Sequence, residues 1–203
     1  MMVWAVLAAP RRGRRMGVVV PLPLSGASMP IKSLIRTIPH HPKPGVQFRD
    51  ITTLLKDPSG FRRTIDAFAE RYMDKDIQLV AAIEARGFIV GAAIADRLGA
   101  GFIPIRKQGK LPAETLGEDY DLEYGTDRVE MHVDALEGGE RILLVDDLIA
   151  TGGTAEAAAR LIGRMGGKVV EAAFIVDLPD LGGRRRLESL GLTVFALTEF
   201  EGD

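Results

Sequence analysis

The segment from Arg141 to Met165 constrains the fold more than any other part of the chain. Its apolar run Ile142–Val145 is typical of a strand that is buried on both faces. The strand leads into two aspartates, Asp146 and Asp147, and then into a short loop of glycine and threonine. From Thr154 onward the sequence is typical of a helix. A strand, a loop and a helix in this order predict one unit of an α/β fold.

Other apolar runs and amphipathic stretches extend this pattern along the chain. Short apolar runs predict strands, and apolar residues three or four positions apart predict helices. Because the two alternate, we expect a mostly parallel sheet with helices on both faces. The predicted strands are 79–83, 142–145 and 169–176, and the predicted helices are 57–73, 88–98 and 154–165.

Three segments depart from the alternation of strands and helices. Residues 107–127 are polar and contain three glycines, so they predict a lid or binding loop. Residues 128–133, which follow, alternate between apolar and polar and predict a half-exposed strand. The segment 31–50 is short, and we expect it to form a small hood over one end of the domain.

The first 28 residues differ from the rest of the chain. Apolar residues precede four arginines, which is the reverse of the order in a secretory signal. Prolines interrupt both apolar pieces, and neither reaches the roughly 20 residues that span a bilayer. We interpret residues 1–28 as a poorly ordered extension or as translation from too early a start, with a transit segment as the alternative, and residues 29–203 as one domain.

Composition excludes several classes of chemistry. The chain has no cysteine, so it has no disulfide, thiolate metal site or cysteine nucleophile, and a reducing compartment such as the cytoplasm is permitted. Residues 29–203 hold 22 basic and 28 acidic residues, a net charge of −6, which does not favour nucleic-acid binding. The three histidines, His40, His41 and His132, do not have the spacing of metal ligands, so no direct metal ligand is expected.

The loop after the predicted strand 142–145 has the chemistry of a phosphate site. Backbone N–H groups at a helix start lack helical partners and attract an anion, and Gly152 and Gly153 let the chain approach it closely. Asp146 and Asp147 would instead suit sugar hydroxyls, or Mg²⁺ through water. The motifs of P-loop nucleotidases and dinucleotide-binding folds are both missing from the sequence. The alternative is a plain turn with two solvated aspartates.

The sequence VDDLIATGGTA at 145–155 resembles the phosphoribosyl-pyrophosphate loop of the type I phosphoribosyltransferases. The resemblance runs from about Ile31 to the C-terminus and is strongest to the members of the family that act on adenine. It includes KPGVQFRDITTLLKDP at 43–58, EARGF at 84–88, IRKQGKLPAET at 105–115 and DLEYGTDRVEMHVDAL at 121–136.

This resemblance implies a reaction and a set of site residues. The reaction is transfer of the phosphoribosyl group from phosphoribosyl pyrophosphate to adenine, giving AMP and pyrophosphate in purine salvage, with Mg²⁺ on the pyrophosphate and a homodimer as the active form. The implied sites are Glu123 and Tyr124 on the lid for catalysis; Asp146, Asp147, Ala150, Thr151, Gly152, Gly153 and Thr154 for the phosphoribosyl group; Glu84, Ala85, Arg86, Gly87, Arg106, Lys107 and Lys110 for pyrophosphate; and Val46, Phe48, Arg49 and Leu148 for adenine.

Several alternatives stay open at this point. Glu114 is the fallback for the catalytic carboxylate, and the basic residues of the pyrophosphate set could be solvated charges on loops. His41 and Gln47 depart from the family pattern, which leaves guanine, hypoxanthine or xanthine as other possible bases. A non-catalytic regulator that binds phosphoribosyl pyrophosphate is a further hypothesis, although the acidic body argues against it. The cluster Gly182–Arg186 is interpreted as a solvated surface.

Overall fold

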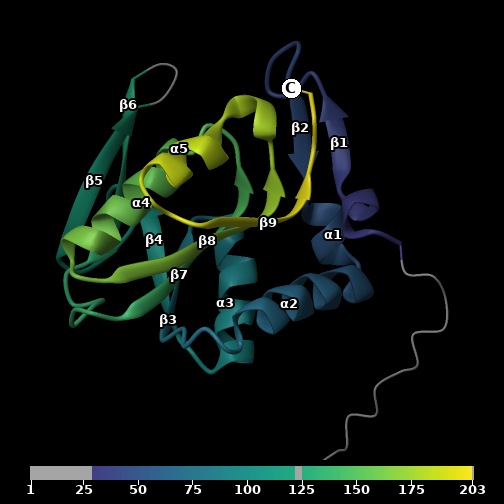
Figure 1. The fold of residues 1–203 in the computed structure, drawn as a ribbon. Helices are drawn as coiled ribbons and strands as arrows, with labels where there is room; N and C mark the ends of the chain where they lie inside the picture. The colour runs from purple at the N-terminus through teal and green to yellow at the C-terminus, as the bar shows by residue number, and fades with distance from the viewer. Residues whose placement is uncertain (1–28, 122–124, 203) are drawn as a thin grey trace, which may run out of the picture.

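The computed structural model describes residues 29–121 and 125–202, and its centre is a seven-stranded sheet (Figure 1). In spatial order the strands are β5 (Thr115–Asp121), β6 (Thr126–His132), β4 (Gly101–Lys107), β3 (Leu79–Ile83), β7 (Arg141–Ile149), β8 (Lys168–Asp177) and β9 (Val194–Glu199). Strands β4, β3, β7, β8 and β9 are parallel, whereas β6 is antiparallel to both β4 and β5. The mostly parallel sheet confirms the predicted fold class.

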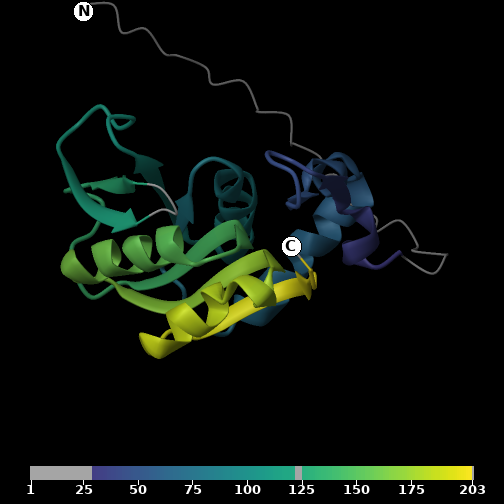
Figure 2. The same cartoon turned by 90° about the horizontal axis from the view of Figure 1, so that it is seen from above.

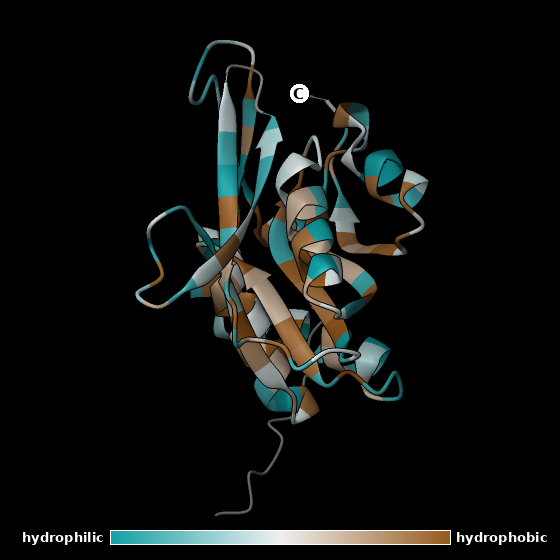
Figure 3. Ribbon diagram, turned by 90° about the vertical axis from the view of Figure 1, so that its left-hand side faces the viewer, coloured by the Kyte–Doolittle hydropathy of each residue, from teal (hydrophilic) through white to brown (hydrophobic). Residues whose placement is uncertain are grey.

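Helices cover both faces of the sheet, because successive side chains of its central strands point to opposite sides. In β7, Ile142 and Leu144 join one apolar core, and Leu143 and Val145 join the other. Figure 3 shows hydrophobic residues along these central strands. The first core lies under α4 (Gly153–Arg164) and α5 (Gly183–Ser189), and the second under α1 (Thr52–Lys56), α2 (Pro58–Tyr72) and α3 (Arg86–Leu98).

The helices begin near the residues that the sequence predicts. Asp57 caps α2 by accepting a hydrogen bond from the N–H of Gly60 at 2.5 Å, and Pro58 occupies the first helical position. Helix α3 starts two residues earlier than predicted and ends at Leu98. Gly99 follows it with a φ of 66°, the left-handed conformation typical of a residue that terminates a helix. Helix α4 is shifted by a single residue toward the N-terminus relative to the prediction.

The prediction of a loop over 107–127 is wrong for residues 115–121, which form β5, and for residues 126–127, which begin β6. The two strands form an antiparallel hairpin in which Thr115 pairs with His132 and Asp121 pairs with Thr126. The polar composition hid these strands, because only Tyr120 and a few apolar neighbours on one face enter the core. Charged side chains on the other face made the sequence look like a loop. The predicted strand at 128–133 is confirmed as part of β6.

The N-terminal hood is a two-stranded hairpin of β1 (Arg36–Pro39) and β2 (Gln47–Asp50), preceded by the 3₁₀ turn η1 (Ile31–Leu34). Figure 2 shows it at one end of the molecule, with the C-terminus beside it. A second 3₁₀ turn, η2 (Pro179–Leu181), leads into α5. None of the helices in the described part of the chain is long and apolar enough to cross a bilayer.

Candidate active site

The carboxyl ends of three neighbouring parallel strands bring the predicted site residues together. Ala82 of β3 pairs with Val145 of β7, and Ile83 of β3 pairs with Ile105 of β4. The residues that follow these positions are therefore adjacent at one edge of the sheet. They are Glu84 to Gly87 after β3, Arg106 and Lys107 at the end of β4, and Asp146 and Asp147 near the end of β7. Ligands of open α/β sheets bind at this edge.

The two aspartates of β7 differ in their surroundings. The backbone N–H of Asp147 donates a hydrogen bond to Oδ1 of Asp146 at 2.8 Å. Burial raises the pKa of Asp146 well above its usual range, and the neighbouring charge of Asp147 adds to this rise. Asp147 is 5% exposed, and its Oδ2 lies 2.8 Å from Nε of Arg86 in an ion pair. The pair therefore combines a carboxyl group of raised pKa with a carboxyl group that faces a guanidinium.

Gly87 allows α3 to start against this acidic pair. A Cβ atom at position 87 would lie 2.9 Å from Oδ1 of Asp146 and 3.0 Å from the carbonyl oxygen of Val145. Real Cβ atoms essentially never come closer than 3.0 Å to another heavy atom, so any larger residue would push the helix away. The turn before α3 also contains a cis peptide bond between Glu84 and Ala85, for which the sequence carries no signal.

The loop from Ala150 to Thr154, called the phosphate loop below, surrounds a cavity of about 110 Å³. The cavity is lined by Asp146 and by residues 148–155. Helix α4 starts at Gly153, and no side chain in the described residues forms a hydrogen-bonded cap at its first turn. The N–H groups of this turn are thus free of a side-chain competitor, which is the arrangement that attracts a phosphate.

The cations predicted for pyrophosphate are held by acidic neighbours. Nε of Arg106 donates to Glu84 at 2.8 Å, and its Nη1 donates to the carbonyl oxygen of Lys110 at 2.9 Å. Lys107 forms hydrogen bonds with Asp127 and with the Tyr120 hydroxyl. Burial lowers the pKa of Lys107, but these hydrogen bonds outweigh it and leave the pKa raised. Arg106 and Lys107 are therefore held by neighbouring groups, whereas the Lys110 side chain is exposed.

The predicted base-binding residues come from the hood and from β7. The ring of Phe48 meets the ring of His41 edge-on at 5.1 Å, and Cζ of Arg86 lies 5.5 Å from the Phe48 ring centre. His41 thus still supplies an aromatic contact, although it departs from the family pattern. Arg86 therefore links the Phe48 ring of the hood to Asp147, because its guanidinium contacts both. Leu148 is partly buried and lines the cavity of the phosphate loop.

The side chain of Arg49 points away from the other predicted base-binding residues. Its Nη1 donates to Oγ1 of Thr37 at 2.7 Å, and its Nη2 donates to the carbonyl oxygen of Gly202 at 3.1 Å. Its guanidinium also lies over the ring of Phe200, 4.6 Å from the centre. The prediction that Arg49 binds the base can therefore concern its backbone only, because its side chain is committed to the C-terminal segment. Val46 precedes β2, and its N–H donates to the carbonyl oxygen of Lys43 at 3.2 Å.

The predicted catalytic residues, Glu123 and Tyr124, lie outside the described residues. The end of β5 that leads toward them is next to the phosphate loop, because a Cβ at Gly153 would lie 3.5 Å from the carbonyl oxygen of Asp121. Glu114 precedes the other end of β5, where its carbonyl oxygen accepts from the N–H of Val133 at 3.1 Å. The seven residues of β5 span about 23 Å, so the structure does not favour Glu114 as a substitute.

Sequence reasoning missed the contact between α5 and the phosphate loop. The interpretation of Gly182–Arg186 as a solvated surface is wrong for Gly183 and Arg184, whereas Arg185 and Arg186 are exposed. Gly183 is buried, and its N–H donates to the carbonyl oxygen of Ala150 at 2.9 Å. Arg184 and Arg186 form ion pairs with the buried acids Asp177 and Glu156. The adjacent glycines were the one signal in the sequence, since glycine often marks a close approach of two backbones.

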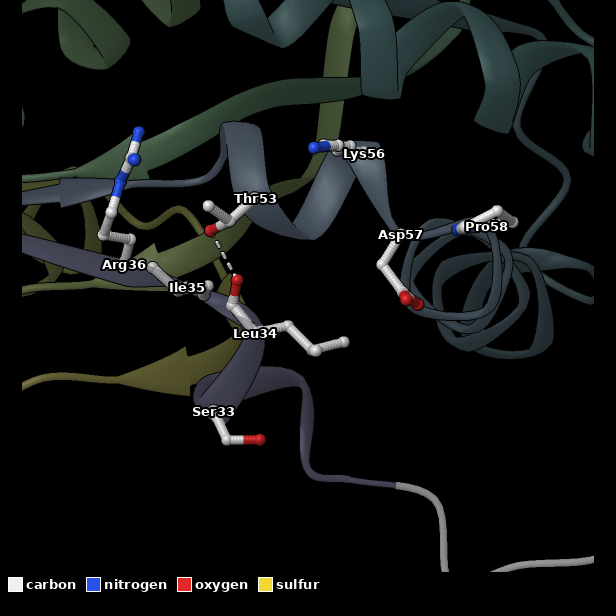
Figure 4. A pocket seen from close by; sticks show the side chains of 8 residues that line it. All are labelled: Ser33, Leu34, Ile35, Arg36, Thr53, Lys56, Asp57 and Pro58. Atoms are coloured by element: carbon white, nitrogen blue, oxygen red, sulfur yellow. Dashed lines mark hydrogen bonds between the residues drawn. The ribbon is translucent and has the colours of Figure 1, made fainter.

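Another surface cavity, of about 470 Å³, lies at the base of the hood (Figure 4). Its lining residues are Ser33, Leu34, Ile35, Arg36, Thr53, Lys56, Asp57 and Pro58, and none of these belongs to the predicted site. Oγ1 of Thr53 donates to the carbonyl oxygen of Leu34 at 2.6 Å, and Asp57 caps α2. These contacts join the hood to the helices. In the described residues, no group of three or more potential ligands could hold a metal ion.

Comparisons with known proteins agree with this geometry. A model of the phosphoribosyl transferase domain matches residues 50–190. Adenine phosphoribosyltransferase of Nitrosospira multiformis is 67% identical over 175 residues, which cover 86% of this chain and all of the relative. A crystal structure of adenine phosphoribosyltransferase from Rhodothermus marinus superposes with a TM-score of 0.79 at 50% identity, covering 84% of this chain and 96% of that one. The enzyme from Saccharomyces cerevisiae, crystallised with an imino-altritol bisphosphate and adenine, gives 0.78 at 36% identity, covering 83% and 96%.

Proposed function

Because the chain belongs to the phosphoribosyl transferase family and stands among its adenine phosphoribosyltransferases, we propose that the strand ends described above form its active site. The chain transfers the phosphoribosyl group from phosphoribosyl pyrophosphate to adenine, giving AMP and pyrophosphate. Relatives that are 57% to 67% identical bear this activity in their names, so another base or a non-catalytic regulator is not favoured.

The reaction breaks one bond and forms one. The bond between C1 of the ribose and the pyrophosphate oxygen breaks, N9 of adenine bonds to C1, and the proton on N9 is released. As the first bond breaks, the sugar becomes cationic and negative charge builds on the leaving group. A site for this reaction therefore needs positive charge near the pyrophosphate and carboxylates near the sugar.

The Arg86–Asp147 ion pair is the observation that carries the proposed assignment. It joins a cation on the turn after β3 to a carboxylate at the end of β7, both beside the phosphate loop. We assign Asp147 and Asp146 to the ribose hydroxyls, which would donate hydrogen bonds to the carboxyl oxygens of both residues. The residues assigned to pyrophosphate are Glu84 to Gly87, Arg106, Lys107 and Lys110.

The phosphate loop is assigned to the 5′-phosphate. Its support is the cavity lined by residues 148–155 and the uncapped start of α4. The positive end of the helix dipole would stabilise the dianionic phosphate there. Anchoring this phosphate at a distance from C1 fixes the ribose, so that binding energy from a non-reacting group orients the reacting carbon.

Carboxylate oxygens of the kind offered by Asp146 and Asp147 suit Mg²⁺, which binds phosphates and retains several waters. With no cluster of three protein ligands in the described residues, we propose that the metal is held mainly by pyrophosphate and water, with these two aspartates contacting it through water. When bound, Mg²⁺ supplies positive charge at the leaving pyrophosphate. This assignment leaves Arg106 and Lys107 to fix the orientation of the leaving group.

Adenine is placed between Phe48 of the hood and Leu148 of β7. An aromatic ring stacks on a purine face, and backbone groups at Val46 and Arg49 would distinguish an amino from an oxo substituent at position 6. Glu123, with Tyr124 beside it, is proposed to assist proton movement at the adenine ring. This assignment depends on the family resemblance. Closure of residues near them would exclude water from the activated donor.

One assay tests the activity. The purified chain is incubated with Mg²⁺ and phosphoribosyl pyrophosphate, and with adenine, guanine, hypoxanthine or xanthine in turn. We expect AMP and pyrophosphate in equal amounts from adenine, and little turnover of the oxo-purines. Turnover of an oxo-purine without AMP formation would contradict the proposed base pocket.

We further propose that residues 29–203 act as one domain and that the active form is a cytoplasmic homodimer. The cysteine-free composition is compatible with a reducing compartment. Ile89 and Phe102 are 48% and 38% exposed, and Phe102 contacts Phe88, so α3 and β4 carry an apolar surface that a second copy could cover. Sedimentation equilibrium of the wild type and of Ile89→Glu tests this, since loss of an apolar interface would give a monomer.

A further inference from the structure

Helix α5 begins against the back of the phosphate loop. The N–H of Gly183 donates to the carbonyl oxygen of Ala150 at 2.9 Å. A Cβ atom at position 183 would overlap that oxygen and would lie 2.8 Å from the backbone nitrogen of Gly152. These neighbours are backbone atoms, which cannot swing aside as a flexible side chain could. Residue 183 must therefore be glycine for the loop to keep its present position.

The residue of the phosphate loop that faces Gly183 is also a glycine. Gly152 has a φ of 79°, and a Cβ atom on it would lie 2.9 Å from the carbonyl oxygen of Gly183 and 3.0 Å from its Cα. Two glycines from segments about 30 positions apart thus face each other with their backbones in contact. Because Gly152 immediately precedes the first residue of α4, a shift of Gly183 would be transmitted to the N–H groups at the start of that helix.

The first turn of α5 is anchored to the sheet. Nε of Arg184 donates to Oδ2 of Asp177 at 2.6 Å, and its Nη1 donates to the carbonyl oxygen of Val194 at 2.9 Å. Asp177 is fully buried at the end of β8, and Val194 is the first residue of β9. A buried and hydrogen-bonded carboxylate fixes the guanidinium more firmly than a surface pair would. Gly183 is therefore held by the rigid edge of the sheet.

Helix α5 is anchored to α4 as well. Arg186 forms an ion pair with Glu156, which lies in the first turn of α4 and is 8% exposed. The second oxygen of Glu156 pairs with Arg160 at 2.5 Å. Figure 1 shows α5 beside α4. One short helix thus touches the phosphate loop through Gly183 and the helix that follows the loop through Arg186.

We propose that α5 braces the phosphate loop, so that Gly183, Arg184 and Arg186 are positioning residues for the phosphoribosyl donor. The inference rests on the proposed role of the loop in binding the 5′-phosphate. None of these three residues needs to contact the substrate. They hold Ala150 and Gly152 in the arrangement that presents free N–H groups to the phosphate, and a site prepared in this way binds without first having to order its loop.

The main test is Gly183→Ala, with Gly163→Ala as the matched control. Gly163 lies in α4, and within the described residues a methyl group added there would meet nothing within 4 Å beyond the backbone of its own helix. The control therefore adds the same methyl group without a clash.

We expect Gly183→Ala to raise KM for phosphoribosyl pyrophosphate by about ten- to a hundredfold, while KM for adenine stays within twofold. Calorimetric titration with phosphoribosyl pyrophosphate alone should show the same loss. An unchanged donor affinity in a folded Gly183→Ala protein would overturn the proposal.

Arg186→Gln provides a milder test should the alanine variant fail to fold, which its melting curve and circular dichroism would show. It removes the ion pair with Glu156 and leaves the contact of Gly183 with the loop. We expect a smaller rise in the donor KM, about threefold to tenfold, again without a change for adenine. A rise in both KM values, or in neither, would count against a brace specific to the donor.

Thr151→Ala separates this inference from the proposed function on which it rests. Thr151 lines the cavity of the phosphate loop, and its loss should weaken donor binding directly. If Thr151→Ala weakens binding and Gly183→Ala does not, the brace is wrong and the phosphate site stands. If neither variant weakens binding, the loop is not the 5′-phosphate site, and the proposed function fails together with the inference.

Discussion

Nε of Arg86 lies 2.8 Å from Oδ2 of Asp147. Arg86 follows β3 and is assigned to pyrophosphate, whereas Asp147 lies near the end of β7 and is assigned to the ribose. In the free protein each neutralises the other, so Asp147 presents little net charge to an incoming anionic donor. In the proposed assignment, donor binding would place a more highly charged partner beside Arg86, and the guanidinium could then exchange one anion for another without being left unpaired.

This relationship predicts non-additive effects on donor binding. Arg86→Gln leaves the buried carboxylate of Asp147 uncompensated beside the pyrophosphate, so donor affinity should fall by about a hundredfold, equivalent to roughly 3 kcal/mol. Adding Asp147→Asn removes that charge and should recover part of the loss, with a coupling energy of about 1 kcal/mol. Calorimetric titration of the wild type, both single variants and the double variant completes a double-mutant cycle and gives this coupling energy. Strictly additive losses would mean that the two residues do not act together on the donor.

Glu123→Gln should separate chemistry from binding. The amide keeps the size of the side chain but cannot accept the adenine proton, so kcat should fall by about 10² to 10⁴-fold while donor affinity stays within twofold. Single-turnover AMP formation and calorimetry give the two quantities. Glu114→Gln is the matched control, because Glu114 lies beyond the opposite end of β5 and should leave kcat unchanged. The reverse result would show that the wrong carboxylate was assigned.

Phe200→Ala should weaken adenine binding from a distance. The ring centre is 4.8 Å from Nζ of Lys32 in η1 and 4.6 Å from Cζ of Arg49 in β2, so Phe200 ties the C-terminal segment to the hairpin that carries Phe48. Its loss would let the hood leave the binding position more often, and KM for adenine should rise about fivefold. KM for the donor should not change. Val133→Ala, a substitution at an exposed site, is the control. If Phe200→Ala raised KM for adenine and KM for the donor equally and the control raised neither, the variant would be damaged in general and not at the adenine site.

Glu171→Gln should reduce stability without altering the site. This carboxylate is 1% exposed in β8 and pairs with Arg71 of α2 and with Lys75, which lies in the turn after that helix. Removing its charge leaves two cations short of a partner, although both are about one-third exposed and can turn to water. We expect a loss of roughly 2 to 3 kcal/mol in the free energy of unfolding. Urea denaturation measures it, and KM values that also change would contradict a purely structural role.

Stability should depend on pH through Asp50. Hydrogen bonds from Arg36, together with those from Thr52, outweigh burial and lower the pKa of Asp50 from 3.8 to about 2. Because the folded protein binds this proton more weakly than the unfolded chain, the contribution is complete above about pH 4 and disappears as the pH falls toward 2.

The wild type should therefore exceed Asp50→Asn in free energy of unfolding at pH 6, and the difference should shrink between pH 4 and pH 2. Denaturant titrations at each pH measure that difference. Asp134→Asn, at an exposed position, serves as the control for the loss of one negative charge. A difference that stays constant down to pH 2 would show that the Asp50 carboxylate is not what stabilises the hood.

The sequence by itself determined the parallel sheet and the candidate phosphate loop. Both depend on neighbours along the chain: buried strands appear as apolar runs such as Ile142–Val145, and the loop appears as a Gly-Thr segment between a strand and a helix. The β-strand order of this fold also brings Asp147 and Arg86 to one edge, as the resemblance implied. These features could be predicted because the local sequence patterns favour the same structure as the fold.

Only the tertiary structure decided the hairpin of β5 and β6, the direction of Arg49 and the contact between Gly183 and the phosphate loop. In each case the deciding partner lies far along the chain: Gly202 is 153 positions from Arg49, and Ala150 is 33 positions from Gly183. A polar strand becomes recognisable only when its partner supplies the hydrogen bonds, and a glycine acquires its role only when another backbone approaches it. Such long-range contacts leave no periodic signal in the sequence, which is why the solvated-surface interpretation failed for Gly183 and Arg184.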